Sequence, residues 1–169
     1  RYHPRIAVQN EPVYESLTPS EKAAFDQLYT HYFYHRHNDF WYHEAMKKLP
    51  ELTDSTRMLV CGEDLGMIPD CVKGVMDELR ILSLEIQRMP KNPAETFGDP
   101  AHYPYRSVCT ISTHDMSTLR GWWHEDANLT RRYFYDVLSG WGDYPTEAPG
   151  WLCDSIVLKH LLGNSMLCI

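Results

Sequence analysis

Residues 57–69 read RMLVCGEDLGMIP. The apolar run at 57–61 is bounded by turn residues, which predicts a buried β-strand. The acidic pair Glu63 and Asp64 follows directly, and Gly66 allows a tight turn before a helix that we expect to start at the proline. Parallel α/β folds place carboxylates in this way, at the carboxyl ends of their strands, where such folds keep their chemistry.

A second segment repeats this layout further along the chain. Residues 107–115 read SVCTISTHD, so a strand-like run leads into His114 and Asp115. Two acidic residues delivered in the same way indicate carboxylate catalysis. They also indicate that the chain carries only part of a site.

The remaining pattern alternates strands and helices. Strands are expected at 57–61, 81–86, 107–112 and 166–169; helices are expected from 19 to 49 with Pro50 as the stop, from 69 to 79, and around 117–123, 129–138 and 148–162; residues 90–106 read as a long loop. Continuous apolar strands between helices predict an α/β fold with a parallel sheet. Four such strands fit a small doubly wound domain or half of an eight-stranded barrel.

Composition narrows the function classes. The chain has 169 residues, enough for one domain, and a net charge of -7 that argues against a nucleic-acid partner. Five cysteines without a CxxC pair favour a reducing cytoplasm, and no apolar run is long enough to span a membrane. Because the chain opens on Arg1 and ends on an apolar run, we expect a fragment of a longer protein.

Each acidic segment has a second interpretation. Glu63 can act as a general acid and base, or Glu63 or Asp64 can cap the following helix. Period two along a strand sends these two side chains to opposite sides, so they are a poor carboxylate pair. His114 and Asp115 can hydrogen-bond sugar hydroxyls, or they can be a structural histidine beside a capping aspartate.

Sequence motifs for a zinc site, a serine nucleophile or a nucleotide site are lacking. His31 and His35 have the i, i+4 spacing that can bind zinc, but no HExxH accompanies them, and an aromatic surface helix explains them better. No GxSxG, GxGxxG or GxxxxGK[ST] motif occurs, so neither a serine nucleophile nor a nucleotide cofactor is expected. We therefore predict no metal and no cofactor.

Three segments in order resemble one family. They are CGEDLGMIP at 61–69, EIQRMP at 85–90 and STHDMSTLRGWW at 112–123. Together they resemble the 4-α-glucanotransferases (amylomaltase or disproportionating enzyme, glycoside hydrolase family 77) over nearly the whole chain. The pattern is most similar to the branch that includes the plant cytosolic, maltose-consuming enzymes.

This resemblance implies a partial (β/α)8 TIM barrel and a retaining double displacement. It implies that Glu63 is the acid/base, that Asp115 stabilises the transition state, and that His114 binds the sugar next to the cleaved bond. The family's nucleophile, an aspartate on the fourth barrel strand, has no match here, since neither Asp39 nor Asp64 stands in its context. Residues 1–169 would then be the C-terminal half of the catalytic barrel, roughly strands five to eight.

The resemblance also implies partners. They are maltodextrin, maltose or another α-glucan, and the remainder of the chain's own barrel. The isolated piece should be inactive, and it could self-associate through exposed strand edges. Two other readings stay open: a related retaining α-glucan hydrolase, and a non-catalytic carbohydrate-binding or scaffold module.

Overall fold

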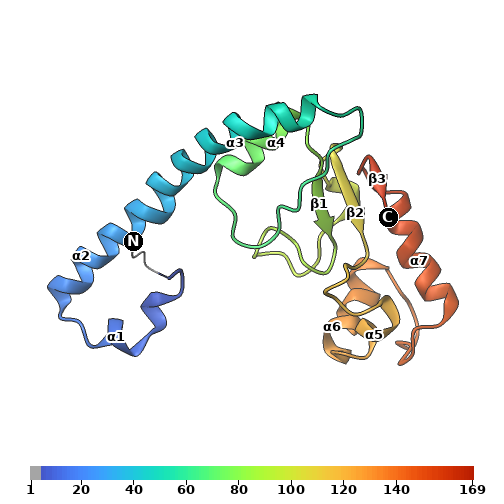
Figure 1. The fold of residues 1–169 in the computed structure, drawn as a ribbon. Coiled ribbons are helices and arrows are strands. Elements are labelled where there is room, and N and C mark those ends of the chain that lie inside the picture. Colours follow the sequence, from blue (N-terminus) through green and yellow to red (C-terminus); the bar gives the residue numbers. More distant parts are fainter. Residues whose placement is uncertain (1–4) are drawn as a thin grey trace. The chain divides into compact units, whose positions relative to one another are not determined.

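The computed structural model describes residues 5–169, which divide into two compact units (Figure 1). One unit comprises the N-terminal residues up to Arg57 together with residues 67–79. The other comprises residues 58–66 and 80–169, and it contains the sheet. The second unit includes both segments that the sequence singles out for catalysis.

Helices build the first unit. They are η1 (Val8–Asn10), α1 (Pro12–Glu15), α2 (Pro19–Thr30), the π-helical η2 (His31–Arg36), α3 (His37–Asp54) and α4 (Cys71–Leu79). The predicted start of α2 is confirmed as a capping box: the Glu21 amide donates to Thr18 Oγ1, and the Thr18 amide donates to the Glu21 carboxylate at 2.9 Å.

The prediction that Pro50 ends the long helix is wrong, because α3 continues to Asp54. Proline removes one amide donor and usually breaks a helix. Here the Ser55 amide still donates to the Glu51 carbonyl, so the turn beyond the proline closes normally. None of the residues of α3 is buried.

A parallel sheet forms the centre of the second unit. Its strands are β1 (Ser83–Ile86), β2 (Ser107–Thr110) and β3 (Leu167–Cys168), in the order β1-β2-β3. Ser83 pairs with Ser107, and Val108 pairs with Leu167. The predicted α/β class with a parallel sheet is therefore confirmed.

The strand predicted at 57–61 is much shorter than expected. Only Cys61 forms a bridge, to Leu82, and it is parallel. Arg80 adopts a left-handed turn (φ 56°), so the neighbouring segment is extended only from Leu82 onward. It therefore offers no strand partner for residues 57–59. Met58 and Leu59 are accordingly exposed.

Helices and an aromatic core complete this unit. The helical segments are η3 (Pro100–His102), α5 (Leu119–Trp123), α6 (Ala127–Arg132), the π-helical η4 (Tyr133–Val137) and α7 (Gly150–Leu161). Residues 90–106 form the predicted loop apart from η3. Trp122, Trp123, Tyr133 and Phe134 pack with Leu152 and neighbouring apolar residues. The rings of Trp122 and Tyr133 meet edge to face at 5.1 Å. This core fixes the helices that follow β2.

The core residue Leu152 provides a stability test. It is fully buried on α7, whereas Leu158 on the same helix is 53% exposed. We expect Leu152→Ala to lower the free energy of unfolding by about 2–5 kcal/mol, since it leaves a cavity. Leu158→Ala should change it by about 0.5 kcal/mol or less. Urea denaturation of the protein measures both, and equal losses would contradict the assigned core.

Buried His160 predicts a pH dependence of stability. Its Nδ1 lies 2.8 Å from the Ile156 carbonyl, and its buried Nε2 has no partner among the described residues. Burial lowers the pKa of His160 below its usual 6.5. The unfolded chain therefore binds a proton at a higher pH than the folded protein does, and stability falls as the pH drops below about 6.5.

Replacing this side chain should remove that dependence. When the pH is lowered from 7 to 5.5, the free energy of unfolding in urea should fall less in His160→Leu than in the wild type. The exposed position His35 supplies the control, and His35→Leu should follow the wild-type curve. An unchanged pH dependence in His160→Leu would contradict this role.

Candidate active site

The loop that carries Glu63 leaves the sheet at a defined point. The Leu82 amide donates to the Val60 carbonyl at 2.9 Å, and the Gly62 amide donates to the Leu82 carbonyl at 2.8 Å. In a continuing parallel ladder, the Leu84 amide would next donate to the Gly62 carbonyl. It donates instead to Asp64 Oδ1 at 2.9 Å. A side chain thus replaces the strand as the acceptor, and the backbone at Glu63 is released from the ladder.

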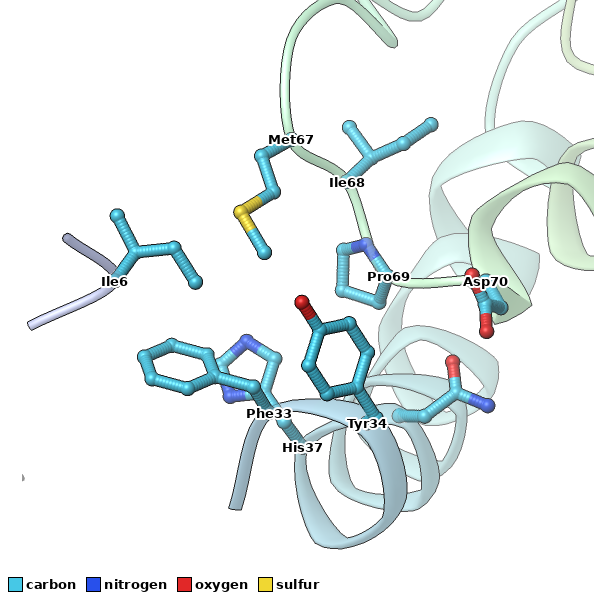
Figure 2. A pocket seen from close by; sticks show the side chains of 9 residues that line it. Ile6, Phe33, Tyr34, His37, Met67, Ile68, Pro69 and Asp70 are labelled. Carbon is cyan, nitrogen blue, oxygen red and sulfur yellow. The ribbon is translucent and has the colours of Figure 1, made fainter. Parts of the chain in front are cut away.

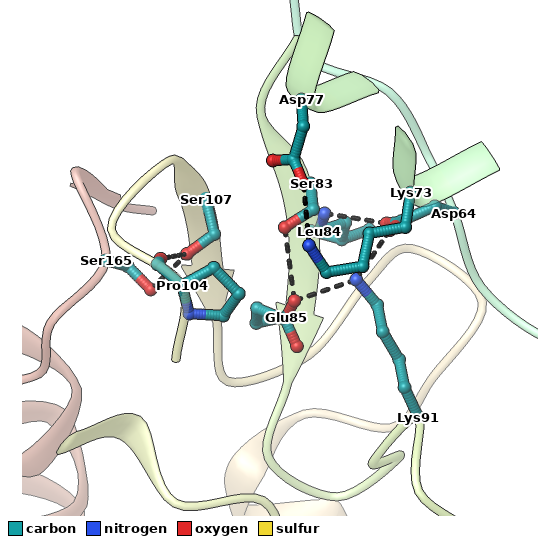
Figure 3. A network of polar contacts seen from close by, with 10 residues as sticks. All are labelled: Asp64, Lys73, Asp77, Ser83, Leu84, Glu85, Lys91, Pro104, Ser107 and Ser165. Atoms are coloured by element: carbon teal, nitrogen blue, oxygen red, sulfur yellow. Dashed lines mark hydrogen bonds and ion pairs between the residues drawn. The ribbon is translucent and has the colours of Figure 1, made fainter. Parts of the chain in front are cut away.

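A buried ion cluster holds Asp64 in this place (Figure 3). Lys91 Nζ lies 2.7 Å from Asp64 Oδ2 and 2.7 Å from Glu85 Oε1. Ser83 Oγ donates to the same Glu85 oxygen at 3.1 Å. Asp64 and Glu85 are only 7% and 8% exposed, so their charges must be paired to be tolerated. Lys91 supplies the cation for both.

The two acidic neighbours therefore have different environments. Asp64 is buried against β1, whereas Glu63 is exposed. This agrees with the expectation that the two side chains point to opposite sides. The interpretation of Asp64 as a helix cap is wrong, because its carboxylate accepts from Leu84 and pairs with Lys91.

His114 and Asp115 lie in the loop after β2. The Met116 amide donates to the Thr113 carbonyl at 3.1 Å, which closes a turn that presents both residues. Their side chains are 87% and 81% exposed, and His114 Nε2 lies 3.3 Å from Asp115 Oδ2. Thr118, not Asp115, caps α5 by accepting from the Gly121 amide. The interpretation of Asp115 as the cap is therefore wrong.

Arg88 anchors this second loop. Its Nε donates to the Ile111 carbonyl at 3.1 Å and its Nη2 to the Ser117 carbonyl at 2.7 Å, one on each side of the turn. Its guanidinium carbon lies 5.1 Å from the centroid of the Trp122 ring. Burial lowers the pKa of Arg88, but an arginine stays protonated at neutral pH. The loop is thus held at both ends by one cation.

One short segment after β1 contacts both loops. Lys91 reaches the loop of Glu63, and Arg88 reaches the loop of His114 and Asp115. Gln87 of the same segment accepts a hydrogen bond from Tyr133 in the aromatic core. The sequence patterns did not identify Arg88 or Lys91 as site residues. Two cationic side chains shortly after the strand predicted at 81–86 could have indicated them.

The hollow and the histidine pair of the first unit contain none of the candidate site residues. A hollow of about 270 Å³ in the first unit is lined mainly by apolar side chains such as Phe33, Met67 and Ile68 (Figure 2). No group of three His, Cys, Asp or Glu residues that could hold a metal ion occurs within residues 5–169. His31 and His35 lie in the π-helix with ring centroids 6.3 Å apart.

All five cysteines are free. Cys61 is exposed, although the apolar run that contains it predicted a buried position. Burial raises the pKa of the Cys168 thiol to about 11, which disfavours the reactive thiolate.

Across the described residues, no helix combines the length and apolar character needed to cross a bilayer.

Comparison with known proteins identifies relatives. The model of glycoside hydrolase family 77, described as 4-alpha-glucanotransferase, matches residues 10–169. The 4-alpha-glucanotransferase DPE2 of Oryza sativa subsp. japonica is 38% identical over the whole chain, which covers 18% of that protein. The 4-alpha-glucanotransferase of Chlamydia trachomatis is 39% identical over half of the chain and 16% of its own length. The chain thus spans less than a fifth of these relatives.

A solved structure supports the fold. The amylomaltase of Streptococcus agalactiae, in complex with acarbose, matches with a TM-score of 0.52 and 16% identity. The match covers 71% of this chain and 24% of that one. At this identity, the likeness supports the shared α/β fold and nothing about individual residues.

The Arg88 contacts predict local order in the loop after β2. Arg88→Met leaves the Ile111 and Ser117 carbonyls without their charged donor, a loss of about 1.5–3 kcal/mol per hydrogen bond. We expect faster deuterium exchange over residues 111–118 and unchanged exchange in α7. Arg132→Met removes one exposed contact, to Thr96, and is the control. Unchanged exchange in Arg88→Met would refute the anchoring role.

Proposed function

Because this chain belongs to the 4-alpha-glucanotransferase family, glycoside hydrolase family 77, we propose that it forms part of the catalytic barrel of a retaining 4-alpha-glucanotransferase. One observation carries the proposal. Glu63 and the pair of His114 and Asp115 both follow parallel sheet segments at their carboxyl ends, with β1 between them. Barrel enzymes assemble their active sites from loops at this edge.

The proposed position in the barrel is strands five to eight. The pairing of Cys61 with Leu82 and the order β1-β2-β3 give four parallel segments that are neighbours in chain order, without a reversal. That order is typical of a barrel, and it favours a half barrel over a doubly wound domain. Residues 1–169 would be the C-terminal half of the barrel, and the rest of the protein would supply the other strands.

The proposed roles follow from the surroundings of each residue. Glu63 protonates the leaving glycosidic oxygen and then deprotonates the acceptor hydroxyl; its exposed side chain supports contact with substrate. Asp115 stabilises the positive charge of the oxocarbenium-like transition state, and His114 binds a hydroxyl of the adjacent sugar. The nucleophile comes from outside this chain, about 5–5.5 Å from the acid/base carboxyl group as retention requires.

The proposed substrates are α-1,4-glucans. Maltose or a maltodextrin is the donor, glucose or a maltodextrin is the acceptor, and the cytoplasm is the proposed site of action. The similarity to rice 4-alpha-glucanotransferase DPE2 over the whole chain supports this class of activity.

The isolated chain should be inactive, because it lacks the nucleophile. Purified residues 1–169 incubated with maltotriose should give no product, while the full-length protein should give glucose and longer oligosaccharides. Transfer by the isolated chain would refute the division of the site. Glucose and maltose without longer products from the full-length protein would indicate a hydrolase instead.

Glu63→Gln tests the acid/base role in the full-length protein. We expect kcat to fall by about 10²–10⁴-fold, since general acid–base catalysis contributes this much. Glu78→Gln changes another exposed glutamate, on α4, and should keep wild-type kcat. Product formation from maltotriose, quantified by chromatography, measures both variants. A loss of less than about tenfold in Glu63→Gln would overturn the assignment.

A further inference from the structure

We propose that Lys91 is a positioning residue for Glu63, acting through the buried carboxylate of Asp64. The inference rests on the proposed acid/base role of Glu63. It adds a residue to that site which does not itself touch substrate. Lys91 comes from the loop after β1, 27 residues beyond Asp64 in the chain.

The Glu63 loop is attached to the neighbouring strand on both sides of Glu63. Two backbone hydrogen bonds hold the chain up to Gly62, and the next attachment is the bond from the Leu84 amide to Asp64. Glu63 lies between these attachments. The position of its backbone therefore depends on where the Asp64 carboxylate is held.

The cluster places two carboxylates around one cation. Asp64 and Glu85 each place an oxygen 2.7 Å from the same Lys91 nitrogen, so the two carboxylates are close together and both are buried. Without Lys91, two like charges would share this site, and either one takes up a proton or the carboxylates separate. Separation would move Asp64 away from the Leu84 amide and displace Glu63.

Other polar groups also surround the cluster. Ser83 donates to Glu85, and the Tyr103 phenol interacts electrostatically with Glu85. Lys91 is the cation paired with both carboxylates within the described residues. Its side chain is 30% exposed, so it can be replaced without opening the aromatic core.

Loss of Lys91 should reduce turnover in a pH-dependent way. At low pH, a proton on one of the two carboxylates removes the like-charge repulsion, and the loop keeps its place. As the pH rises, the proton is lost and the carboxylates repel each other. The kcat of a variant without the cation should therefore peak at a lower pH than that of the wild type.

The experiment compares full-length enzymes on maltotriose from pH 5 to pH 8. We expect Lys91→Met to lower kcat at pH 7 by about 10–100-fold, the size expected for a displacement of about 1 Å, with KM changed much less. Its optimum should move to lower pH. Lys91→Arg keeps the charge and should keep the wild-type optimum.

A double variant and a matched control sharpen the test. Glu85→Gln in the Lys91→Met background removes the repulsion, so it should recover part of the lost kcat and restore the optimum. Lys73→Met breaks an exposed lysine–aspartate pair, Lys73 with Asp77 at 2.6 Å, and should change neither kcat nor the optimum. Figure 3 includes both lysines.

The outcomes separate this inference from the proposed function. Wild-type kcat and optimum in folded Lys91→Met, or the same change in Lys73→Met, would overturn the positioning role. If Lys91→Met does not fold, Lys91→Gln takes its place with the same expected acid shift, and a wild-type optimum there overturns the role equally. Absence of transfer by the wild type, or full activity of Glu63→Gln, would instead refute the proposed function.

Discussion

The ion cluster of Asp64, Lys91 and Glu85 is the interaction on which the candidate site depends. It occurs where the ladder between residues 60–62 and Leu82 stops, just before β1, and the Asp64 carboxylate takes the place of the next backbone acceptor. A strand end would normally release its loop to solvent. Here the loop is tied back by a buried side chain, and the cost of burying that charge is offset by one lysine. Glu63 is thereby exposed on a loop whose two sides are both attached to the sheet.

Arg88 has a similar role for the loop after β2. Its guanidinium donates to the Ile111 carbonyl directly after the strand and to the Ser117 carbonyl just before α5. Arg88 and Lys91 belong to one short segment that is itself joined to the aromatic core through Gln87 and Tyr133. The segment from Gln87 to Lys91 contacts the aromatic core and both acidic loops. Packing of the aromatic rings therefore also affects the positions of the two loops.

Local sequence patterns predicted some of these features well and others poorly. Thr18 and Glu21 form their capping box from a spacing of three residues, so the chain alone specifies it. Pro50 was expected to end a helix, but the turn from Glu51 to Ser55 closes beyond it, and a local rule cannot foresee that outcome. The strand predicted at 57–61 needed an extended partner, and the left-handed turn at Arg80 leaves one only from Leu82 onward.

The sequence by itself determined the alternation of strands and helices, the placement of Glu63, His114 and Asp115 after strand-like runs, and the family to which three ordered motifs point. These features depend on neighbours within a few residues. Only the tertiary structure decided that Asp64 is a buried anchor while Glu63 is exposed, and that Lys91 and Arg88 hold the two loops. Those contacts join residues 27 and 29 positions apart in the case of Lys91 with Asp64 and Arg88 with Ser117. No local spacing encodes them, because their partners meet only when the parallel strands pair.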